Sequence, residues 1–405
     1  MSNRATKTAR LLALAALLAL AVTASGCANG AKAQSTDSAA GKPVVFKIGV
    51  GVPLTAGVVA YGKGTVNATK LAVEKANASE RAKKLEVTFD VVEGDDQGDP
   101  KTGVTVANTF ASNRAIVGVV GHINSGVSIP ASKIYNEAKI VEVTNGSTSP
   151  ALTEQGFNDI FRTCTIDTVQ GSFGADKAVK DLGYKTAYVV DDSTPYGEGL
   201  AKFFVEQFKA DGGTVLGTEK TTDKDTDFGA LASKIKAVNP DVVYYGGLYN
   251  AASLLSKQLK EGGLKSPLFG GDGLANPDYI KLAGAQAAEG DFSTQIGLPL
   301  DELPAGQEFK TAYTAAYPGV EISANDAYAY DAAQVIINAA LTAAEKIGAD
   351  KVITPAGRPE IITAVAATNF DGLTGKVQFD SKGDTLNKAV TLLVVKNGAW
   401  TTWKK

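Results

Sequence analysis

Short apolar runs and amphipathic segments alternate along the chain from Val44 onward. The runs are rich in β-branched residues and end at glycine or a polar residue, as in 44–51 (VVFKIGVG) and 241–246 (DVVYYG). The segments between them carry apolar residues at the spacing of a helix, such as Val104 and Ala107. Apolar strands that alternate with amphipathic helices are typical of parallel sheets with helices on both faces.

The alternation predicts strands and helices in two successive series. We expect strands at 44–51, 85–92, 116–121, 139–144, 186–191, 214–219, 241–246 and 267–269, and helices at 64–77, 100–110, 128–138, 197–210, 228–238 and 251–261. The first series ends near 162–167, where the alternation breaks. We therefore predict an α/β fold with two doubly wound parallel-sheet lobes. In such open sheets ligands bind beyond the carboxyl ends of the strands, so the loops after the strands form the candidate site.

The first residues of the chain have the pattern of an export signal. Positive charges precede the apolar run 11–22, which is too short to span a bilayer but suits a signal peptide. Small residues then lead to Cys27, as in the lipobox of bacterial lipoproteins, although Ala24 stands where leucine is usual. We predict a signal peptide over 1–26, a lipid on Cys27 and a lipid-anchored flexible linker over 27–43. The alternative is an ordinary secreted protein with a chance cysteine.

Composition narrows the possible functions. The 405 residues carry 40 Lys and Arg against 43 Asp and Glu, and the formal net charge is −3. The sequence has no basic stripe, so nucleic acid is not expected as a partner. One histidine, His122, and two cysteines, Cys27 and Cys164, exclude sites that need several ligands of either kind. We expect no metal, no cofactor and no catalytic residue, and we interpret Cys164 as a buried free thiol.

Polar and aromatic side chains follow several of the predicted strands. They are Tyr61, Ser125, Gly146, Ser147 and Thr148 in the first series, and Tyr196, Tyr249 and Asp272 in the second. Hydroxyls and backbone N–H groups near helix starts attract anions such as carboxylates. An acid on the opposite lobe, as Asp272 is, can face an ammonium group. Together these loops predict a site for a zwitterion, with the carboxylate on one lobe and the amine on the other.

Each of these polar residues also has a structural interpretation. Ser125 and Thr148 lie near helix starts, where hydroxyl residues commonly cap the helix. Asp272 lies in a GGDG loop, which is typical of a solvated turn. Only the joint pattern favours a binding site.

Three other motifs point to different chemistry. The segment 57–64 nearly matches the phosphate-binding loop of nucleotide-binding proteins, but Gly64 replaces the hydroxyl that binds Mg²⁺. The acidic segment 95–99 could bind Ca²⁺, yet it lacks the spacing of an EF-hand, so a solvated loop is favoured. His122 has no partners at the spacing of a catalytic triad, and we expect it to be buried and hydrogen-bonded.

Several longer motifs are specific enough to indicate a family. They are 95–100 (DDQGDP), 121–135 (GHINSGVSIPASKIY), 161–163 (FRT), 196–201 (YGEGLA) and 243–247 (VYYGG). In this order they resemble the leucine/isoleucine/valine-binding proteins of ABC importers, which are periplasmic binding proteins of type I. The resemblance extends over about 44–405 and implies two lobes joined by a three-strand hinge.

The resemblance also implies roles for individual residues. Ser125 and the segment Gly146-Ser147-Thr148 match positions that bind the ligand carboxylate. Tyr61 and Tyr196 match tyrosines that flank the ligand. Asp272 takes the place of a glutamate that binds the ammonium group.

Some positions depart from the family pattern. Leu248 stands where the family has a tyrosine beside the ammonium group, with Tyr249 one position on, and Asp272 is one methylene shorter than the family's glutamate. Two cysteines that pair in enteric members fall at Gly98 and Asn124, so that disulfide is absent. These departures bear on which ligand binds, and not on the fold or the transport role.

The resemblance further implies that the chain crosses between the lobes three times. We place the crossings near 163–168, 294–298 and 374–378, which gives a first lobe of 44–165 with 297–375 and a second lobe of 166–296 with 376–405. A helix within 320–347 then belongs to the first lobe, with Asp326 and Tyr328 near the cleft or hinge.

These observations predict an exported substrate-binding lipoprotein of an ABC importer. We expect a monomer that closes its lobes around a small amino acid, with an aliphatic or branched side chain preferred. The resemblance implies permease subunits with cytoplasmic ATPases as partners. The signal peptide and the lipobox-like residues before Cys27 predict a location at the outer face of the cytoplasmic membrane or in the periplasm, with membrane contact through the lipid anchor only.

Other functions remain open. The same fold could bind an amide, urea or an aromatic acid, although a neutral ligand would leave Asp272 buried and unpaired. A sensor module coupled to a receptor is a further alternative. A hydrolase would need an acid–base pair that the sequence does not contain.

Overall fold

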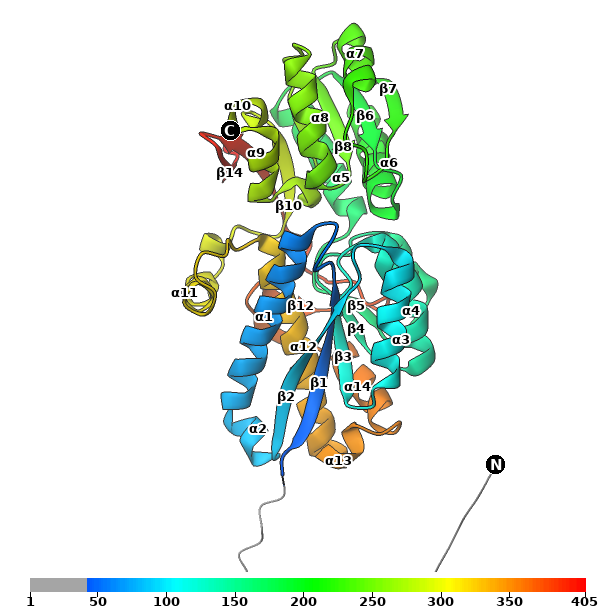
Figure 1. Cartoon of the computed structure of the whole chain (residues 1–405), viewed down its shortest axis with the longest axis vertical. Coiled ribbons are helices and arrows are strands. Elements are labelled where there is room, and N and C mark those ends of the chain that lie inside the picture. Colours follow the sequence, from blue (N-terminus) through cyan, green and yellow to red (C-terminus); the bar gives the residue numbers. More distant parts are fainter. Residues whose placement is uncertain (1–41) are drawn as a thin grey trace, which may run out of the picture. The chain divides into compact units, whose positions relative to one another are not determined.

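Two sheets with parallel strands at their centres organise the chain (Figure 1). The structure is a computed structural model and describes residues 42–405. The predicted signal peptide over 1–26, the predicted lipidation site Cys27 and the predicted linker up to residue 41 lie outside the described residues. Of the helices within 42–405, none combines the length and the hydrophobicity that a bilayer crossing requires.

The first lobe contains a five-stranded parallel sheet in the order β2-β1-β3-β4-β5. Its strands are β1 (Val44–Val52), β2 (Val87–Asp95), β3 (Ile116–Gly121), β4 (Glu142–Thr144) and β5 (Ile160–Arg162). Helices α1 (Val59–Ala78) and α12 (Ala324–Ile347) pack side by side on one face, and α3 (Pro100–Ser112) and α4 (Ser125–Ala138) cover the other. The remaining elements on this side are α2 (Glu80–Lys84), η1 (Pro150–Gln155), η4 (Leu300–Glu302), α11 (Gly306–Ala316), α13 (Ala349–Val352), α14 (Gly357–Ala366), β11 (Asn369–Gly372) and β12 (Gly375–Gln378).

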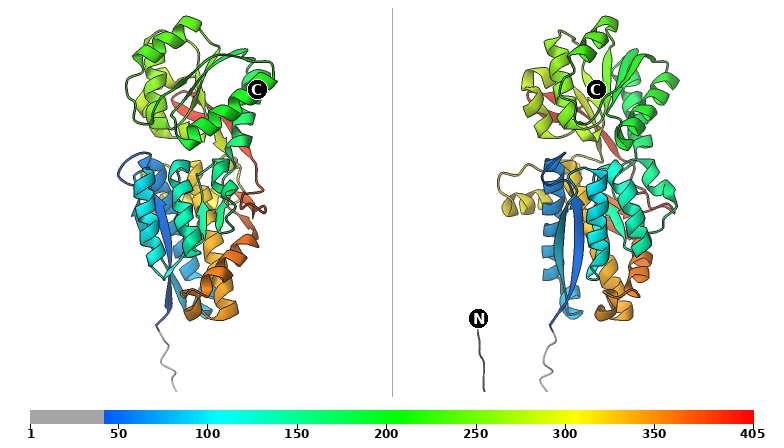
Figure 2. Two further views of the ribbon diagram at one scale, coloured as in Figure 1. Left: turned by 90° about the vertical axis from the view of Figure 1, so that its right-hand side faces the viewer. Right: turned by 45° about the vertical axis from the view of Figure 1, so that its right-hand side comes forward.

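The second lobe is drawn from two further sides in Figure 2. It contains a seven-stranded sheet in the order β14-β13-β10-β9-β8-β6-β7. Its strands are β6 (Thr186–Asp191), β7 (Thr214–Lys220), β8 (Val242–Gly246), β9 (Leu268–Gly270), β10 (Phe292–Ile296), β13 (Val390–Lys396) and β14 (Ala399–Thr402). Strands β6 to β10 are parallel, whereas β13 and β14 add an antiparallel edge that the sequence pattern did not predict. The helical elements are α5 (Asp167–Asp176), η2 (Lys177–Asp181), α6 (Pro195–Ala210), α7 (Gly229–Val238), α8 (Tyr249–Glu261), η3 (Asp272–Leu274), α9 (Pro277–Ala283) and α10 (Ala285–Ala288).

The central strand β8 shows why the strands of this fold have continuous apolar sequences. Tyr244 stacks on Phe204 of α6, with ring centroids 3.7 Å apart. The next residue, Tyr245, packs in a different apolar cluster that includes Leu255 of α8. Consecutive side chains therefore bury against helices on opposite faces, and both positions must be apolar or aromatic.

Helix α1 begins earlier than its apolar pattern indicates. The predicted helix started at residue 64, whereas α1 starts at Val59 and includes Gly62 and Gly64. Gly64 lies where a side chain would collide with the Asp326 carboxyl of α12, so glycine permits the two helices to approach closely. The segment 57–64 is therefore largely helical, and its interpretation as a phosphate-binding loop is excluded.

The connections between the lobes lie together at the hinge. The Gly297 N–H, just after β10, donates to the carbonyl of Ala389, just before β13, at 2.8 Å. Cys164, just after β5, packs with Ile296 and Tyr328 in a small buried cluster. The predicted free, buried thiol is confirmed, and burial raises the pKa of Cys164 to about 12. The residue boundaries proposed for the two lobes stay a prediction.

Candidate functional site

A cavity of about 830 Å³ lies between the strand-end loops of the two lobes. Six of the predicted site residues line it: Tyr61, Ser125, Gly146, Tyr196, Leu248 and Asp272. Three others, Ser147, Thr148 and Tyr249, lie outside its lining, and their role in binding stays a prediction. The meeting of loops that are far apart in the sequence follows from the parallel topology, which brings the carboxyl ends of neighbouring strands to one edge.

Asp272 is the buried acidic group of the cavity, whereas Asp99, Asp223 and Asp225, which also line it, are partly exposed. It lies in η3, directly after β9, and is only 6% exposed, so its interpretation as a solvated turn is wrong. The Tyr196 hydroxyl donates to its Oδ1 at 2.9 Å, and the Gly273 N–H donates to the Tyr196 hydroxyl oxygen at 3.0 Å. Burial raises the pKa of Asp272 to about 6, against the opposing effect of hydrogen bonds from Tyr196 and Gln170.

Among residues 42–405, no lysine, arginine or histidine forms an ion pair with the Asp272 carboxylate. A buried carboxylate without a cation is costly, and an ammonium group that enters the cavity would compensate it. The electrostatics of the second lobe therefore suit a cationic group of a ligand.

Tyr61 connects the two lobes at the cavity. Its hydroxyl donates to the backbone carbonyl of Asp272 at 3.0 Å. Its ring packs edge-on against Tyr249 of α8, with centroids 5.7 Å apart. Tyr249 thus packs against the ring of Tyr61 and helps to fix its position, although Tyr249 does not line the cavity itself.

The first lobe offers hydrogen-bond donors on the other side of the cavity. Ser125 is the first residue of α4 and is 1% exposed. Its Oγ accepts the Ser149 N–H at 3.2 Å, which leaves its own hydroxyl proton to donate. Among the described residues, the backbone N–H groups of Ser125, Gly126 and Thr148 have no acceptor. These donors, with the start of a 14-residue helix, suit a carboxylate.

The alternative interpretation of Ser125 and Thr148 as helix caps is wrong. Asn124 occupies the N-cap position of α4, and Ser149 occupies that of η1. The N–H groups of Gly146 and Ser147 donate to the Thr144 hydroxyl at 3.2 and 3.0 Å. These two residues therefore do not offer free backbone donors, and Thr148 is the member of the segment that does.

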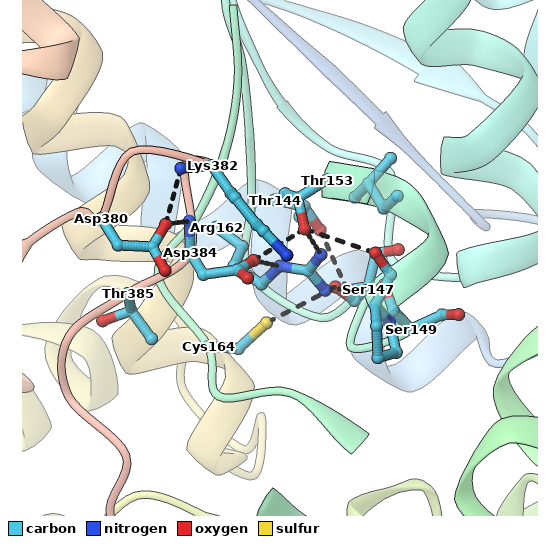
Figure 3. A network of polar contacts seen from close by, with 12 residues as sticks. Thr144, Ser147, Ser149, Thr153, Arg162, Cys164, Asp380, Lys382, Asp384 and Thr385 are labelled. Atoms are coloured by element: carbon cyan, nitrogen blue, oxygen red, sulfur yellow. Dashed lines mark hydrogen bonds and ion pairs between the residues drawn. The ribbon is translucent and has the colours of Figure 1, made fainter. Parts of the chain in front are cut away.

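A buried arginine fixes the shape of this donor loop (Figure 3). Arg162 of β5 is completely buried, and its Nη1 donates to the carbonyls of Ser147 and Ser149 at 2.8 and 3.0 Å. Its Nε lies 2.6 Å from Oδ1 of Asp384, and its Nη2 donates to the Thr153 hydroxyl at 2.8 Å. Because the guanidinium holds the carbonyls on one side, the Thr148 N–H is left free. The sequence pattern did not indicate this role, although an arginine at the end of an apolar strand is unusual.

The remaining acidic and histidine motifs are structural. His122 is completely buried, with Nδ1 2.6 Å from Oδ2 of Asp96 and Nε2 2.9 Å from the Tyr135 hydroxyl, which confirms the predicted role. Asp99 caps α3 through the Lys101 and Thr102 N–H groups. Within the described part of the chain, no group of three or more acidic, histidine or cysteine side chains could hold a metal ion.

Two amides that line the cavity, those of Asn124 and Asn325, were not predicted from the sequence. Asp326 was expected near the cleft or hinge instead, but its carboxyl accepts the Ser323 N–H at 3.1 Å and stabilises the start of α12. Burial raises the pKa of Asp326 to about 7. Tyr328 lies in the buried cluster at the hinge. A single asparagine in the first turn of a helix gives no signal that would have identified Asn325.

Comparisons with known proteins agree with this architecture. The model of a family described as periplasmic binding protein matches residues 45–399, and the chain belongs to this family. A relative from Brucella abortus (strain 2308), Leu/Ile/Val-binding protein homolog 2, is 34% identical over 343 residues, which cover 83% of this chain and 86% of the relative.

Two solved structures are also similar. A leucine binding protein, LivK, from Thermotoga maritima is 29% identical with a TM-score of 0.79, over 89% of this chain and 98% of that protein. The branched-chain amino acid transporter substrate binding protein LivJ from Streptococcus pneumoniae, in complex with isoleucine, is 25% identical with a TM-score of 0.77, over 89% of this chain and 100% of that protein. These similarities confirm the predicted family and the two-lobed α/β fold.

Proposed function

We propose that this protein captures an amino acid in its zwitterionic form between the two lobes and delivers it to an ABC importer. The observation that carries the proposal is the opposed chemistry of the cavity. Asp272 on one lobe is buried and, among residues 42–405, pairs with no cation, and the free backbone donors of Ser125 and Gly126 line the cavity on the other lobe. An ammonium group and a carboxylate on one small molecule would satisfy both sides.

The proposed work is binding and release, without chemistry. Closure of the lobes around a ligand is a hinge motion driven by the difference in affinity between the open and the closed form. The Tyr61 hydroxyl and the Asp272 carbonyl belong to different lobes, so their hydrogen bond stabilises the closed form. We propose permease subunits with cytoplasmic ATPases as partners of that form, and a monomeric binding protein.

The proposed location is outside the cytoplasm, with the body attached through a lipid on Cys27. The family membership supports export, and the small residues before Cys27 support lipidation. The names of the relatives support an aliphatic amino acid as the ligand class.

A thermal-shift screen of the purified full chain in detergent tests the proposal. The panel contains the twenty amino acids, urea, short amides and aromatic acids. A ligand at 100 times its Kd stabilises the folded state by about 2.7 kcal/mol, which raises the unfolding temperature measurably. We expect stabilisation by one or more amino acids. Stabilisation by neutral amides or aromatic acids alone would contradict the zwitterion site while leaving the fold intact.

A further inference from the structure

The side chain of Asn325 is a polar group without a protein partner in the wall of the cavity. Asn325 is the second residue of α12 and is 5% exposed. Its Nδ2 lies 3.6 Å from the position that a β-carbon on Gly146 would take, which places the amide beside the donor loop. Its backbone carbonyl accepts the Asn145 Nδ2–H at 3.3 Å. Among residues 42–405, no side chain or backbone group forms a hydrogen bond with the Asn325 amide itself.

A second amide in the same lobe has the same property. Asn124 occupies the N-cap position of α4, yet its side chain does not cap the helix. Its Oδ1 is buried and, among the described residues, has no hydrogen-bond partner. Asn124 and Asn325 both line the cavity, together with Ser125 and Gly146. The first-lobe wall is therefore more polar than its function as a carboxylate site requires.

An unpartnered amide in such a place constrains the ligand. An asparagine side chain presents two N–H donors and a carbonyl acceptor. In an open cavity water can occupy these positions, but closure around a ligand removes that water. The ligand carboxylate can accept from the amide N–H groups but has no donor for the amide carbonyl, so a purely aliphatic ligand side chain would leave that carbonyl buried and unsatisfied, which sites with such groups reject strongly.

We propose that the bound amino acid has a polar side chain, a carboxamide or a hydroxyl, that hydrogen-bonds with Asn325. The inference rests on the proposed function, since it assumes that the zwitterion lies between Asp272 and the Ser125 donors. Ile123 and Leu248 also line the cavity and contact the aliphatic carbons of such a ligand. This ligand class differs from the aliphatic one that the resemblance and the names of the relatives favour.

Pairs of amino acids with the same shape test the proposal directly. Asparagine and leucine have side chains of nearly equal shape, as do threonine and valine, and within each pair only the first forms hydrogen bonds. Isothermal titration of the unmodified full chain gives the four affinities. We expect asparagine to bind at least tenfold more tightly than leucine, or threonine than valine, a difference of about 1.4 kcal/mol. The pair that shows the preference distinguishes a carboxamide from a hydroxyl ligand.

Substitutions assign the preference to Asn325. In Asn325→Leu we expect the polar preference to disappear, and in Asn325→Ala we expect it to fall at least tenfold. The control is Asn108→Leu, because Asn108 is exposed on α3 and its side chain contacts only the Val104 carbonyl. Thermal unfolding identifies any variant that does not fold, and the titration of the unmodified chain decides the question independently of the variants.

The contrary outcomes are distinct. If leucine and valine bind as tightly as their polar counterparts, the proposal for Asn325 is wrong and the zwitterion site stands. A polar preference that survives in both Asn325 variants overturns the assignment to this residue. If no amino acid binds, the proposed function fails, and the inference about its ligand fails with it.

Discussion

The Tyr61 hydroxyl donates to the backbone carbonyl of Asp272 at 3.0 Å, and this hydrogen bond joins α1 of the first lobe to η3 of the second. The two residues are 211 positions apart in the sequence. The bond places Tyr61 beside the acid that we propose as the ammonium partner. It therefore links lobe closure to the geometry of the binding site.

Tyr61→Phe removes this hydrogen bond and keeps the ring that packs on Tyr249. A neutral hydrogen bond contributes about 1 kcal/mol, so we expect a loss of roughly fivefold in ligand affinity with little change in thermal stability. Small-angle scattering with saturating ligand measures the closed fraction directly. An unchanged affinity together with an unchanged closed fraction would remove Tyr61 from the closure mechanism.

Asp272→Asn removes the negative charge with almost no change of shape. We expect at least tenfold weaker binding of the amino acid, about 1.4 kcal/mol, because the ammonium group loses the one buried carboxylate among those that line the cavity in the described part of the chain. Titration calorimetry gives the affinity. The control is Asp278→Asn on α9, since that carboxyl lies in the same lobe on the surface and pairs with Lys281.

The affinity of the unmodified protein depends on pH through the same group. Burial raises the pKa of Asp272 to about 6. Binding of an ammonium group requires the ionised form, so affinity is full above pH 6 and decreases by up to about tenfold per unit as the pH falls below it. Titrations between pH 4.5 and 8 measure the profile. Asp272→Asn should have a flatter profile, and equal slopes in the two proteins would contradict the assignment.

Asp167 makes the folded state less stable as the pH rises, whereas a carboxylate that forms an ion pair on the surface makes it more stable. It is the first residue of α5, is completely buried, and burial raises its pKa to about 8. Because the unfolded chain has the lower pKa, the folded state holds a proton that the unfolded state releases. The contribution of Asp167 is therefore most favourable below pH 4 and is lost progressively as the pH rises to 8.

Asp167→Asn tests this dependence. The variant lacks the titrating group, so its stability relative to the unmodified protein should increase between pH 5 and pH 8, by at most about 1.4 kcal/mol per pH unit. Urea unfolding at the two pH values measures the difference. If the stability of both proteins changed equally between the two pH values, the pKa of Asp167 would lie near its ordinary value, and burial would not raise it.

Asp384→Ala removes the only carboxylate that pairs with the buried Arg162 guanidinium among the described residues. Breaking a buried pair from one side costs about 3–5 kcal/mol, so we expect a large loss of stability in urea unfolding. The binding of the amino acid should also weaken, because Arg162 holds the carbonyls of Ser147 and Ser149.

Asp371→Ala is the matched control for this prediction. Asp371 pairs with Lys376 in the hairpin of β11 and β12, and both side chains are largely exposed. Exposed pairs contribute less than about 1 kcal/mol, so stability should hardly change. Equal effects of the two substitutions would show that the Arg162–Asp384 pair has no special role.

The sequence predicted those features that depend on local pattern. Parallel strands buried on both faces must be apolar at every position, which is why β3 and β8 were recognisable. The edge strands β13 and β14 were not predicted, because an antiparallel edge depends on a partner distant in the chain. The helix predicted at 64–77 began too late, because Gly62 and Gly64 are poor helix formers. The structure explains Gly64 by the close packing of α1 against α12.

The candidate site was partly predictable for the same reason. Ser125 and Asp272 follow strands directly, so the rule on strand ends located them. The roles of Asn325 and Arg162 were not predicted. Asn325 lies at the start of a helix and Arg162 at the end of a short strand, and no local sequence pattern distinguishes either residue. Burial and missing partners, which define their roles, exist only in the folded chain.

The pairing of Arg162 with Asp384 has a consequence for biosynthesis. During synthesis from the amino end, β5 and its arginine leave the ribosome long before the residue that neutralises the guanidinium. Until the last part of the chain is available, the first lobe contains an interior charge without a counter-ion and cannot reach its final packing. We therefore expect the first lobe to complete its folding only after the carboxyl end has been made, which suits a chain that is exported before it folds.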